Sequence, residues 1–209
     1  MSGSIRWQAK SGWIEGITVR RPRISKEGRN TPEILVVEDG GQLDIIHSVL
    51  NNEGSLRSPA IVRGYDSKAN WTSVILRGAM ISPGLIVEDM AEVELRHCTV
   101  SDNGAPGIVC RGKSRLRMTQ CRVERNLGSG VYLGGNSRCE ISKCRFSNNA
   151  GGPIDKEIGS ICAPCNGNSL IVASHKVATP KLMPGFRVIR DQDQKVDEVS
   201  SRMNSTICL

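Results

Sequence analysis

The chain has 209 residues and a formal net charge of +7, and 38% of its residues are apolar while only 3% are aromatic. This apolar content is enough for an ordered core, so wholesale disorder, collagen and coiled-coil architectures are excluded. No apolar run approaches the roughly 20 residues that span a bilayer, and residues 1–10 contain no signal-peptide core. We therefore expect a cytoplasmic or nuclear protein with no membrane partner, whose eight cysteines are free thiols or metal ligands.

The first segment in chain order is residues 1–32, which contain two tryptophans and a basic run at residues 20–23. Residues 14–19 alternate in the manner of a short strand, and they match the end of the repeat unit that fills the middle of the chain. The end of a repeat array needs a cap, because its last strands have unpaired edges. We predict that residues 1–32 form an N-terminal cap and a first partial rung.

The middle of the chain, residues 33–175, repeats one unit. Three clear copies begin at Gly84, Gly107 and Gly130, so the period is 23 residues, and weaker copies precede and follow them. Each copy contains three apolar-polar-apolar triplets separated by Gly, Asp, Asn or Ser, which predicts short strands and turns rather than helices. The sequence therefore predicts an all-β solenoid of about six rungs, each with three strands that stack into parallel sheets.

Residues 107–133, GIVCRGKSRLRMTQCRVERNLGSGVYL, resemble the repeats of single-stranded right-handed parallel β-helix proteins. These proteins include the pectate-lyase-like enzymes and also the eukaryotic β-helix F-box proteins with their SHC-binding relatives. The alternation of a Gly-[Val/Ile] strand with a Cys-x-[Val/Phe] strand is most similar to the second group. The resemblance implies a β-helix that presents a recognition surface to another protein, although no F-box-like segment that would recruit a ubiquitin ligase is present.

The cysteines follow the repeat. Cys98, Cys121 and Cys144 form one inward column at intervals of 23 residues. Side chains in register on parallel strands point the same way, so these thiols cannot converge on one metal ion, and buried Cys behaves as a small hydrophobe. Cys162 and Cys165 form a CxxC pair without a second pair to complete a zinc site, and we assign Cys162 to the last rung. We expect no metal site and no cofactor.

A polar column also follows the repeat. Asn103, Asn126 and Asn149 recur at the same turn of successive rungs. Asn tolerates left-handed backbone at such a turn, and its amide can bond the amide one rung away. We therefore expect a structural asparagine ladder there, rather than a catalytic group.

One outward column is apolar and is a candidate binding surface. It would project from the first sheet, where it is either a contact surface for a protein partner or a strip covered by the chain's own tail. The column consists of Val36, Ile61, Ile86, Val109 and Tyr132.

A second candidate surface concentrates positive charge on two consecutive rungs. Such a stripe attracts an acidic peptide, a phosphoprotein, an acidic polysaccharide or a nucleic acid, unless it is only a solvated face. Nucleic acid is disfavoured as a partner, because no aromatic platform is interleaved with the basic residues. The stripe consists of Arg115, Arg122, Arg138 and Arg145.

Catalysis is not indicated by any constellation in the sequence. The resemblance to pectin-cleaving β-helices would imply the signatures Asn-Thr-Asp, Asp-Asp, Gly-His-Gly and Arg-Ile-Lys, which are all missing, and we assign no catalytic residues. The leading hypothesis is a non-catalytic interaction module, an adaptor or substrate-recognition surface that binds another protein. The alternative is a carbohydrate-active β-helix, a lyase, hydrolase or epimerase, that acts on acidic polysaccharide.

The last segment in chain order is residues 176–209, where the glycine and strand pattern stops. Residues 176–185 contain two prolines and are predicted to be a linker. Residues 193–203 either form one short helix with three apolar side chains on one face or are disordered. We expect this tail to lie outside the repeat array.

Overall fold

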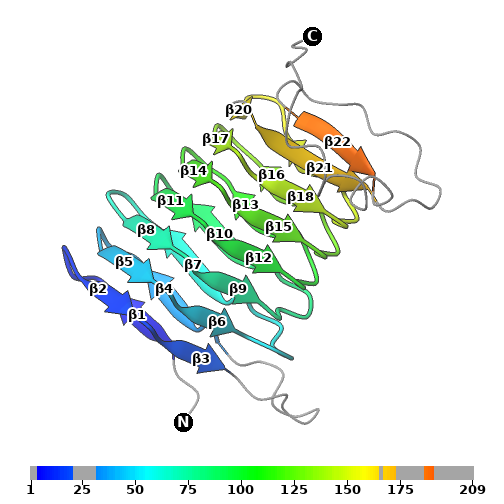
Figure 1. The fold of residues 1–209 in the computed structure, drawn as a ribbon. Coiled ribbons are helices and arrows are strands. Elements are labelled where there is room, and N and C mark those ends of the chain that lie inside the picture. Colours follow the sequence, from blue (N-terminus) through cyan, green and yellow to red (C-terminus); the bar gives the residue numbers. More distant parts are fainter. Residues whose placement is uncertain (1–3, 21–31, 165–166, 173–185, 191–209) are drawn as a thin grey trace.

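The computed structural model describes residues 4–20, 32–164, 167–172 and 186–190. This part of the chain consists of strands and turns that wind into a parallel β-helix (Figure 1). The predicted all-β solenoid is therefore confirmed. Within the described ranges, no helix has the length and hydropathy that crossing a membrane requires.

Each rung contributes one strand to each of three parallel sheets, which we name A, B and C (Figure 1). Sheet A contains β1 (Ile5–Trp7), β4 (Leu35–Val37), β7 (Ala60–Arg63), β10 (Leu85–Glu88), β13 (Ile108–Cys110), β16 (Val131–Leu133) and β19 (Ile154–Lys156). Sheet B contains β2 (Trp13–Glu15), β5 (Gln42–Ile46), β8 (Lys68–Thr72), β11 (Glu92–Arg96), β14 (Arg115–Thr119), β17 (Arg138–Ser142) and β20 (Ile161–Pro164). Sheet C contains β3 (Thr18–Arg20), β6 (Val49–Asn51), β9 (Ile75–Arg77), β12 (Thr99–Ser101), β15 (Arg122–Glu124), β18 (Arg145–Ser147), β21 (Asn168–Val172) and β22 (Phe186–Arg190).

The core fills the space between the three sheets. Alternate residues of each strand point inward, and equivalent residues stack in register along the solenoid. All of the side chains that the three clear copies place inward are at most 3% exposed. They are Leu85, Val87, Val93, Leu95, Cys98, Val100, Ile108, Cys110, Leu116, Met118, Cys121, Val123, Val131, Leu133, Cys139, Ile141, Cys144 and Phe146.

The predicted inward column of cysteines is present. Cys98, Cys121 and Cys144 are buried, and the backbone N–H of Cys121 donates to the Sγ atom of Cys144 over 3.3 Å. The thiol of Cys121 in turn donates to the carbonyl oxygen of Leu95 over 3.3 Å. These thiols therefore behave as small core residues.

The asparagine ladder is also confirmed. The side-chain amide of Asn103 donates to Oδ1 of Asn126, and the amide of Asn126 donates to Oδ1 of Asn149, each over 2.9 Å. The amide of Asn126 also donates to the carbonyl oxygen of Val100 over 3.2 Å. Asn103 and Asn126 are 1% exposed, so the ladder satisfies polar groups that water does not reach.

The turn between sheets B and C uses one left-handed residue in each rung. His47 (φ 48°), His97 (φ 54°), Gln120 (φ 54°) and Lys143 (φ 54°) occupy this position, and all four are exposed. The two histidines therefore lie at exposed positions of an outer turn.

The glycine that begins each clear rung is required because atoms of the neighbouring rung lie too close to leave room for a side chain. A Cβ atom on Gly107 would lie 2.7 Å from the carbonyl oxygen of Gly130, 2.8 Å from Nδ2 of Asn126 and 2.9 Å from Cγ1 of Val123. Real Cβ atoms do not approach other atoms this closely. The chain can therefore turn from sheet C into sheet A above the asparagine ladder only where the side chain is absent.

The ends of the array differ in detail from the sequence-based expectation. Strands β1 to β3, at residues 5–20, form a complete first rung where a partial one was predicted. At the other end, β22 pairs with β21 and extends sheet C into the predicted tail. Cys162 pairs in register with Cys139 and packs against the core, as assigned. The predicted linker at 176–185, the predicted helix at 193–203 and Cys165 lie outside the described residues.

We predict that Asn126→Ala lowers the free energy of unfolding by roughly 2–4 kcal/mol, measured by urea denaturation. The substitution removes the acceptor of the Asn103 amide and the donor to the Val100 carbonyl, and both groups stay buried. The matched control is Asn70→Ala, which removes one exposed bond to Asp44 and should cost about 0.5 kcal/mol or less. Equal losses for the two variants would contradict a stabilising ladder.

Candidate functional site

The predicted apolar column lies on the outer face of sheet A, but one of its members is not accessible. Val36 is only 2% exposed, so its assignment to an exposed stripe is wrong. The strand β1 places Arg6 beside Val36, and the Arg6 guanidinium reaches Glu38, two residues further along β4, over 2.7 Å. The methylenes of Arg6 therefore cross Val36 and shield it.

The other four residues of the apolar column remain partly accessible. Ile61, Ile86, Val109 and Tyr132 pair in register on β7, β10, β13 and β16, and each is half-buried by its neighbours. The hydroxyl of Tyr132 donates to the carboxylate of Glu157, which raises the pKa of the tyrosine. The accessible column is thus shorter than predicted and ends in a polar contact.

A column of alternating charges borders the apolar residues on sheet A. Arg63 donates to Glu38 from Nε over 3.0 Å, and Arg111 donates from Nε to Glu88 over 2.7 Å. Hydrogen bonds from Arg63 and then from Arg6 hold the pKa of the Glu38 carboxyl below its usual value. These ion pairs favour the observed register of the strands, because a strand that slipped along its neighbour would lose the contact between opposite charges.

The predicted basic stripe is divided between two faces of the solenoid. Arg115 and Arg138 pair in register on sheet B, whereas Arg122 and Arg145 pair in register on sheet C. The left-handed turn at Gln120 and Lys143 separates the two pairs. They therefore cannot act as the single positive stripe that their closeness in sequence indicates.

The sheet B pair lies in a shallow depression of about 240 Å³ that contains both signs of charge. Arg115 faces Glu92 on the preceding strand over 3.5 Å, and Arg117 donates to Glu140 over 2.9 Å. Arg138 forms no ion pair among the described residues. Because carboxylates line the same depression, its net attraction for an anion is small.

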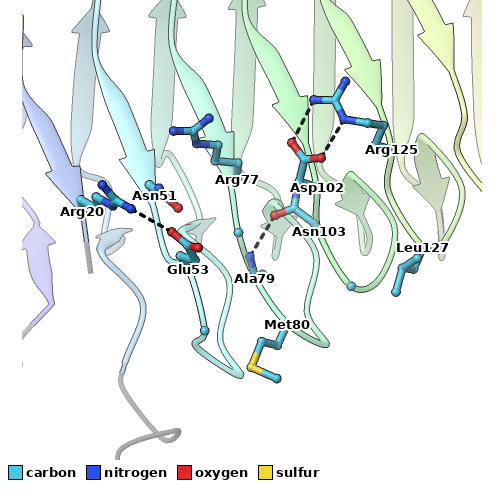
Figure 2. A pocket seen from close by; sticks show the side chains of 13 residues that line it. Arg20, Asn51, Glu53, Arg77, Ala79, Met80, Asp102, Asn103, Arg125 and Leu127 are labelled. Carbon is cyan, nitrogen blue, oxygen red and sulfur yellow. Dashed lines mark hydrogen bonds and ion pairs between the residues drawn. The ribbon is translucent and has the colours of Figure 1, made fainter. Parts of the chain in front are cut away.

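A groove of about 830 Å³ was not predicted from the sequence (Figure 2). It crosses the ends of the first sheet C strands and the turns that lead from sheet C to sheet A. The lining residues are Arg20, Asn51, Glu53, Gly54, Arg77, Gly78, Ala79, Met80, Asp102, Asn103, Gly104, Arg125 and Leu127.

Charges of both signs line this groove. Arg20 meets Glu53 over 3.4 Å at one end, and Arg125 donates to both oxygens of Asp102 over 2.7 and 3.0 Å at the other (Figure 2). Arg77 lies between the two pairs, and its side chain has no hydrogen bond or ion pair among the described residues, although its charge helps to lower the pKa of Asp102 after the larger effect of Arg125. Its guanidinium can therefore still bond to an acidic group of a bound molecule.

Apolar side chains border the same groove. Met80 is 44% exposed and Leu127 is 72% exposed, and the turns that hold them, residues 78–84 and 125–130, each contain two glycines. An arginine beside exposed Met and Leu is a composition that favours protein interfaces, which are enriched in Arg and Met.

The sequence did not reveal this groove because the turns that form it differ in length. Residues 52–59, 78–84 and 102–107 connect sheet C to sheet A in three successive rungs, so a fixed period does not align their side chains. The feature that could have pointed to the groove is that Arg20 and Arg77 each end a sheet C strand, on either side of Asn51, with which both pair in register.

Comparison with known families agrees with this architecture. A family model described as right-handed beta helix region matches residues 34–177. The chain belongs to this family. Comparison of this β-helix with curated proteins and with solved structures found no match. The family establishes a right-handed parallel solenoid, but one fold hosts many functions, and the function has to be argued from the surface.

The groove of this β-helix contains two carboxylates, which is the minimum for glycoside hydrolysis. Glu53 and Asp102 follow Asn51 and Ser101, which are two strand spacings, roughly 10 Å, apart. However, hydrogen bonds from Arg125 hold the pKa of Asp102 below its usual value, so this carboxyl stays ionised at neutral pH and cannot serve as a general acid.

No group of three or more His, Cys, Asp or Glu side chains that could hold a metal ion occurs within the ranges that the structure describes. The inward cysteines are stacked along a line, and the outward carboxylates Glu38, Glu88, Asp102 and Glu140 each contact an arginine. The described surface therefore offers ion pairs and apolar contacts as its means of recognition.

We predict that the stabilising effect of Glu38 is lost in acid. The folded-state pKa of Glu38 is lowered, so its contribution is complete above the unfolded pKa of about 4.3 and disappears as the pH falls through the folded value. Glu38→Gln should lower the free energy of unfolding by roughly 1 kcal/mol at neutral pH. In urea titrations this difference from the parent protein should shrink below about pH 4.

The control for that measurement is Glu53→Gln, which breaks a more exposed pair with Arg20 over 3.4 Å. It should change the stability by about 0.5 kcal/mol or less at either pH. A difference for Glu38→Gln that persists unchanged in acid would show that packing, and not charge, is responsible.

Proposed function

We propose that this chain is a non-catalytic interaction module that binds another protein in the groove beside sheet C. The observation that carries the proposal is the combination of exposed Met80 and Leu127 with Arg77, whose side chain has no ion pair among the described residues, in one groove of about 830 Å³. A partner segment that supplies one acidic group to Arg77 and apolar side chains to Met80 and Leu127 would bury all three.

The form of the β-helix supports this proposal. Parallel stacking makes a rigid scaffold, so the turns that border the groove are held in place before a partner arrives, and less freedom is lost on binding. The similarity of residues 107–133 to the repeats of β-helix F-box and SHC-binding proteins also favours a role as an adaptor or substrate-recognition surface.

We predict that a photo-crosslinking amino acid at position 127 captures a discrete protein from cell lysate, identified by mass spectrometry. The same crosslinker at position 65 is the control, because Leu127 and Tyr65 are both 72% exposed but Tyr65 lies in a turn between sheets A and B. Arg77→Ala in the position-127 protein should abolish the capture. Capture of the same proteins from both positions would contradict binding in the groove.

A second candidate function is hydrolysis, cleavage or epimerisation of an acidic polysaccharide. The observation that favours it is that Glu53 and Asp102 share one groove with three arginines. Against it, Asp102 is bound by Arg125 and remains ionised, and none of the described residues that line the groove is aromatic.

We predict that the folded protein forms no product from polygalacturonate or alginate. The measurement is the absorbance of unsaturated uronate, together with a reducing-end assay. Release of product by the parent protein, lost in Glu53→Gln, would establish the second candidate and overturn the first. The Glu140→Gln variant is the control, because Glu140 is paired with Arg117 outside the groove.

A further inference from the structure

Several outer positions of this β-helix carry opposite charges on adjacent rungs. Carboxylates contact arginines of the adjacent rung at Glu38 with Arg63, Glu88 with Arg111, Asp102 with Arg125 and Glu140 with Arg117, and Arg115 likewise contacts Glu92 over 3.5 Å. In contrast, Arg115 pairs in register with Arg138, and Arg122 pairs in register with Arg145.

Two arginines in register on adjacent strands destabilise the fold, because like charges lie directly opposite each other at a strand spacing of about 4.8 Å. Nothing in the column relieves this repulsion for the sheet C pair. The next residue beside Arg122 is Thr99, and the next residue beside Arg145 is Ser169. The pair therefore lacks the flanking carboxylate that the alternating columns have.

Arg145 carries a further sign of a missing partner. Its Nε atom is buried and has no hydrogen-bond acceptor. Buried donors are nearly always paired, since an unpaired one loses its hydration without gaining a bond. Because Nε is covered by the protein, an external anion could bond to it only after the Arg145 side chain moves.

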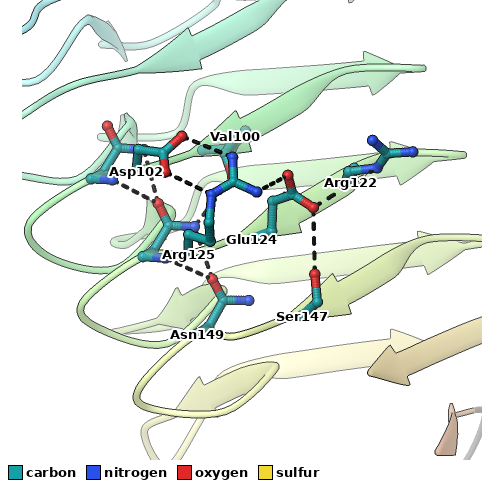
Figure 3. A network of polar contacts seen from close by, with 9 residues as sticks. Val100, Asp102, Arg122, Glu124, Arg125, Ser147 and Asn149 are labelled. Atoms are coloured by element: carbon teal, nitrogen blue, oxygen red, sulfur yellow. Dashed lines mark hydrogen bonds and ion pairs between the residues drawn. The ribbon is translucent and has the colours of Figure 1, made fainter. Parts of the chain in front are cut away.

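The nearest carboxylate to the pair is already engaged. Glu124 lies 4.0 Å from Nε of Arg122, but it accepts a hydrogen bond from Arg125 and another, over 3.4 Å, from the hydroxyl of Ser147 (Figure 3). Arg125 is shared between Glu124 and Asp102, so it offsets only part of the charge of Glu124. The three arginines Arg122, Arg125 and Arg145 face these two carboxylates, so one net positive charge remains for an external anion.

The sheet B pair does not offer the same opportunity. Glu92, Glu94 and Glu140 line the depression that contains Arg115 and Arg138, and they would repel an anion. Of the two like-charged pairs, only Arg122 and Arg145 combine in-register arginines with an unsatisfied buried donor.

We propose that Arg122 and Arg145 bind a phosphate monoester carried by a protein partner. A phosphorylated side chain has a charge of about −1.5 to −2 and three acceptor oxygens, which matches two adjacent guanidinium forks better than a single carboxylate does. Side chains on neighbouring strands, about 4.8 Å apart, can both reach one phosphate group. A phosphate bound between the two guanidinium groups would bridge them and offset their mutual repulsion.

A phosphodiester or a uronate chain is a weaker match, since each unit carries one negative charge. The positions in register with Arg122 and Arg145 hold Thr18, Val49, Ile75, Thr99, Ser169 and Arg187, so this column of the described strands offers no aromatic platform for bases or sugars. This proposal shares with the proposed function only the premise that the occupant is a protein.

The test is fluorescence anisotropy with the whole chain and three pools of degenerate peptides that differ only at the central residue: phosphoserine, serine or glutamate. The phosphoserine pool should bind at least about tenfold more tightly than either other pool. Arg122→Gln and Arg145→Lys should each weaken this binding about tenfold or more, because each removes one guanidinium fork. Glu124→Gln should strengthen it, since a repelling carboxylate is removed.

Two controls separate binding from structure. Arg117→Gln removes an equally basic side chain from an alternating column and should leave phosphoserine binding within about twofold of the parent protein. Arg122→Gln should leave the melting temperature unchanged or raise it, because it relieves like-charge repulsion. A fall in melting temperature that accounts for the lost binding would assign the pair a structural role and overturn the proposal.

Equal affinity for the phosphoserine and serine pools would also overturn it, as would tighter binding of single-stranded DNA or polygalacturonate with loss in the same variants. The proposed function is tested separately, because Arg77→Ala and Leu127→Glu should leave phosphoserine binding unchanged. If crosslinking at position 127 fails while phosphoserine binding is intact, binding in the groove is refuted and phosphate binding by the arginine pair stands. If crosslinking succeeds while phosphoserine binding fails, phosphate binding is refuted and binding in the groove stands.

Discussion

The whole structure depends on stacking of parallel strands in register at about 4.8 Å. In that arrangement each side chain meets its own equivalent from the rung before and the rung after, so a column has one chemical character over many rungs. Cysteines pack as small hydrophobes, asparagines bond one another, and opposite charges alternate. A residue type is acceptable at a position only if it tolerates contact with a neighbour of the same kind or a complementary one.

This constraint gives a physical criterion for function. Columns that satisfy themselves, such as the asparagine ladder through Asn126, are explained by stability alone. Positions whose hydrogen bonds or charges are not met by the neighbouring rungs need another explanation, because they lower the stability of the fold and form no compensating contact within it. Arg77 in the groove and the Arg122 and Arg145 pair on sheet C belong to this second class, whereas Arg117 and Arg111 belong to the first.

The two surfaces proposed for binding lie along the same sheet. The groove crosses the early strands of sheet C and their following turns, and the arginine pair lies on β15 and β18 of that sheet. The turn-side end of β15 links them chemically, since Glu124 accepts from Arg125, and Arg125 holds Asp102 at the end of the groove (Figure 3). A partner protein that contacts both surfaces would supply an acidic group and apolar side chains to the groove and a phosphate to the arginine pair, all along one face of the solenoid.

The sequence alone determined the solenoid, its period, its inward side chains and its asparagine ladder, because these features repeat and each copy supports the same interpretation. It could not show that Arg6 covers Val36, because the two residues belong to rungs separated by a long connection. Nor could it show that Arg115 and Arg122 face different directions, since a single left-handed residue at Gln120 turns the chain between them. The groove was decided only by the tertiary structure, because it is built from turns of unequal length, where no period relates one rung to the next.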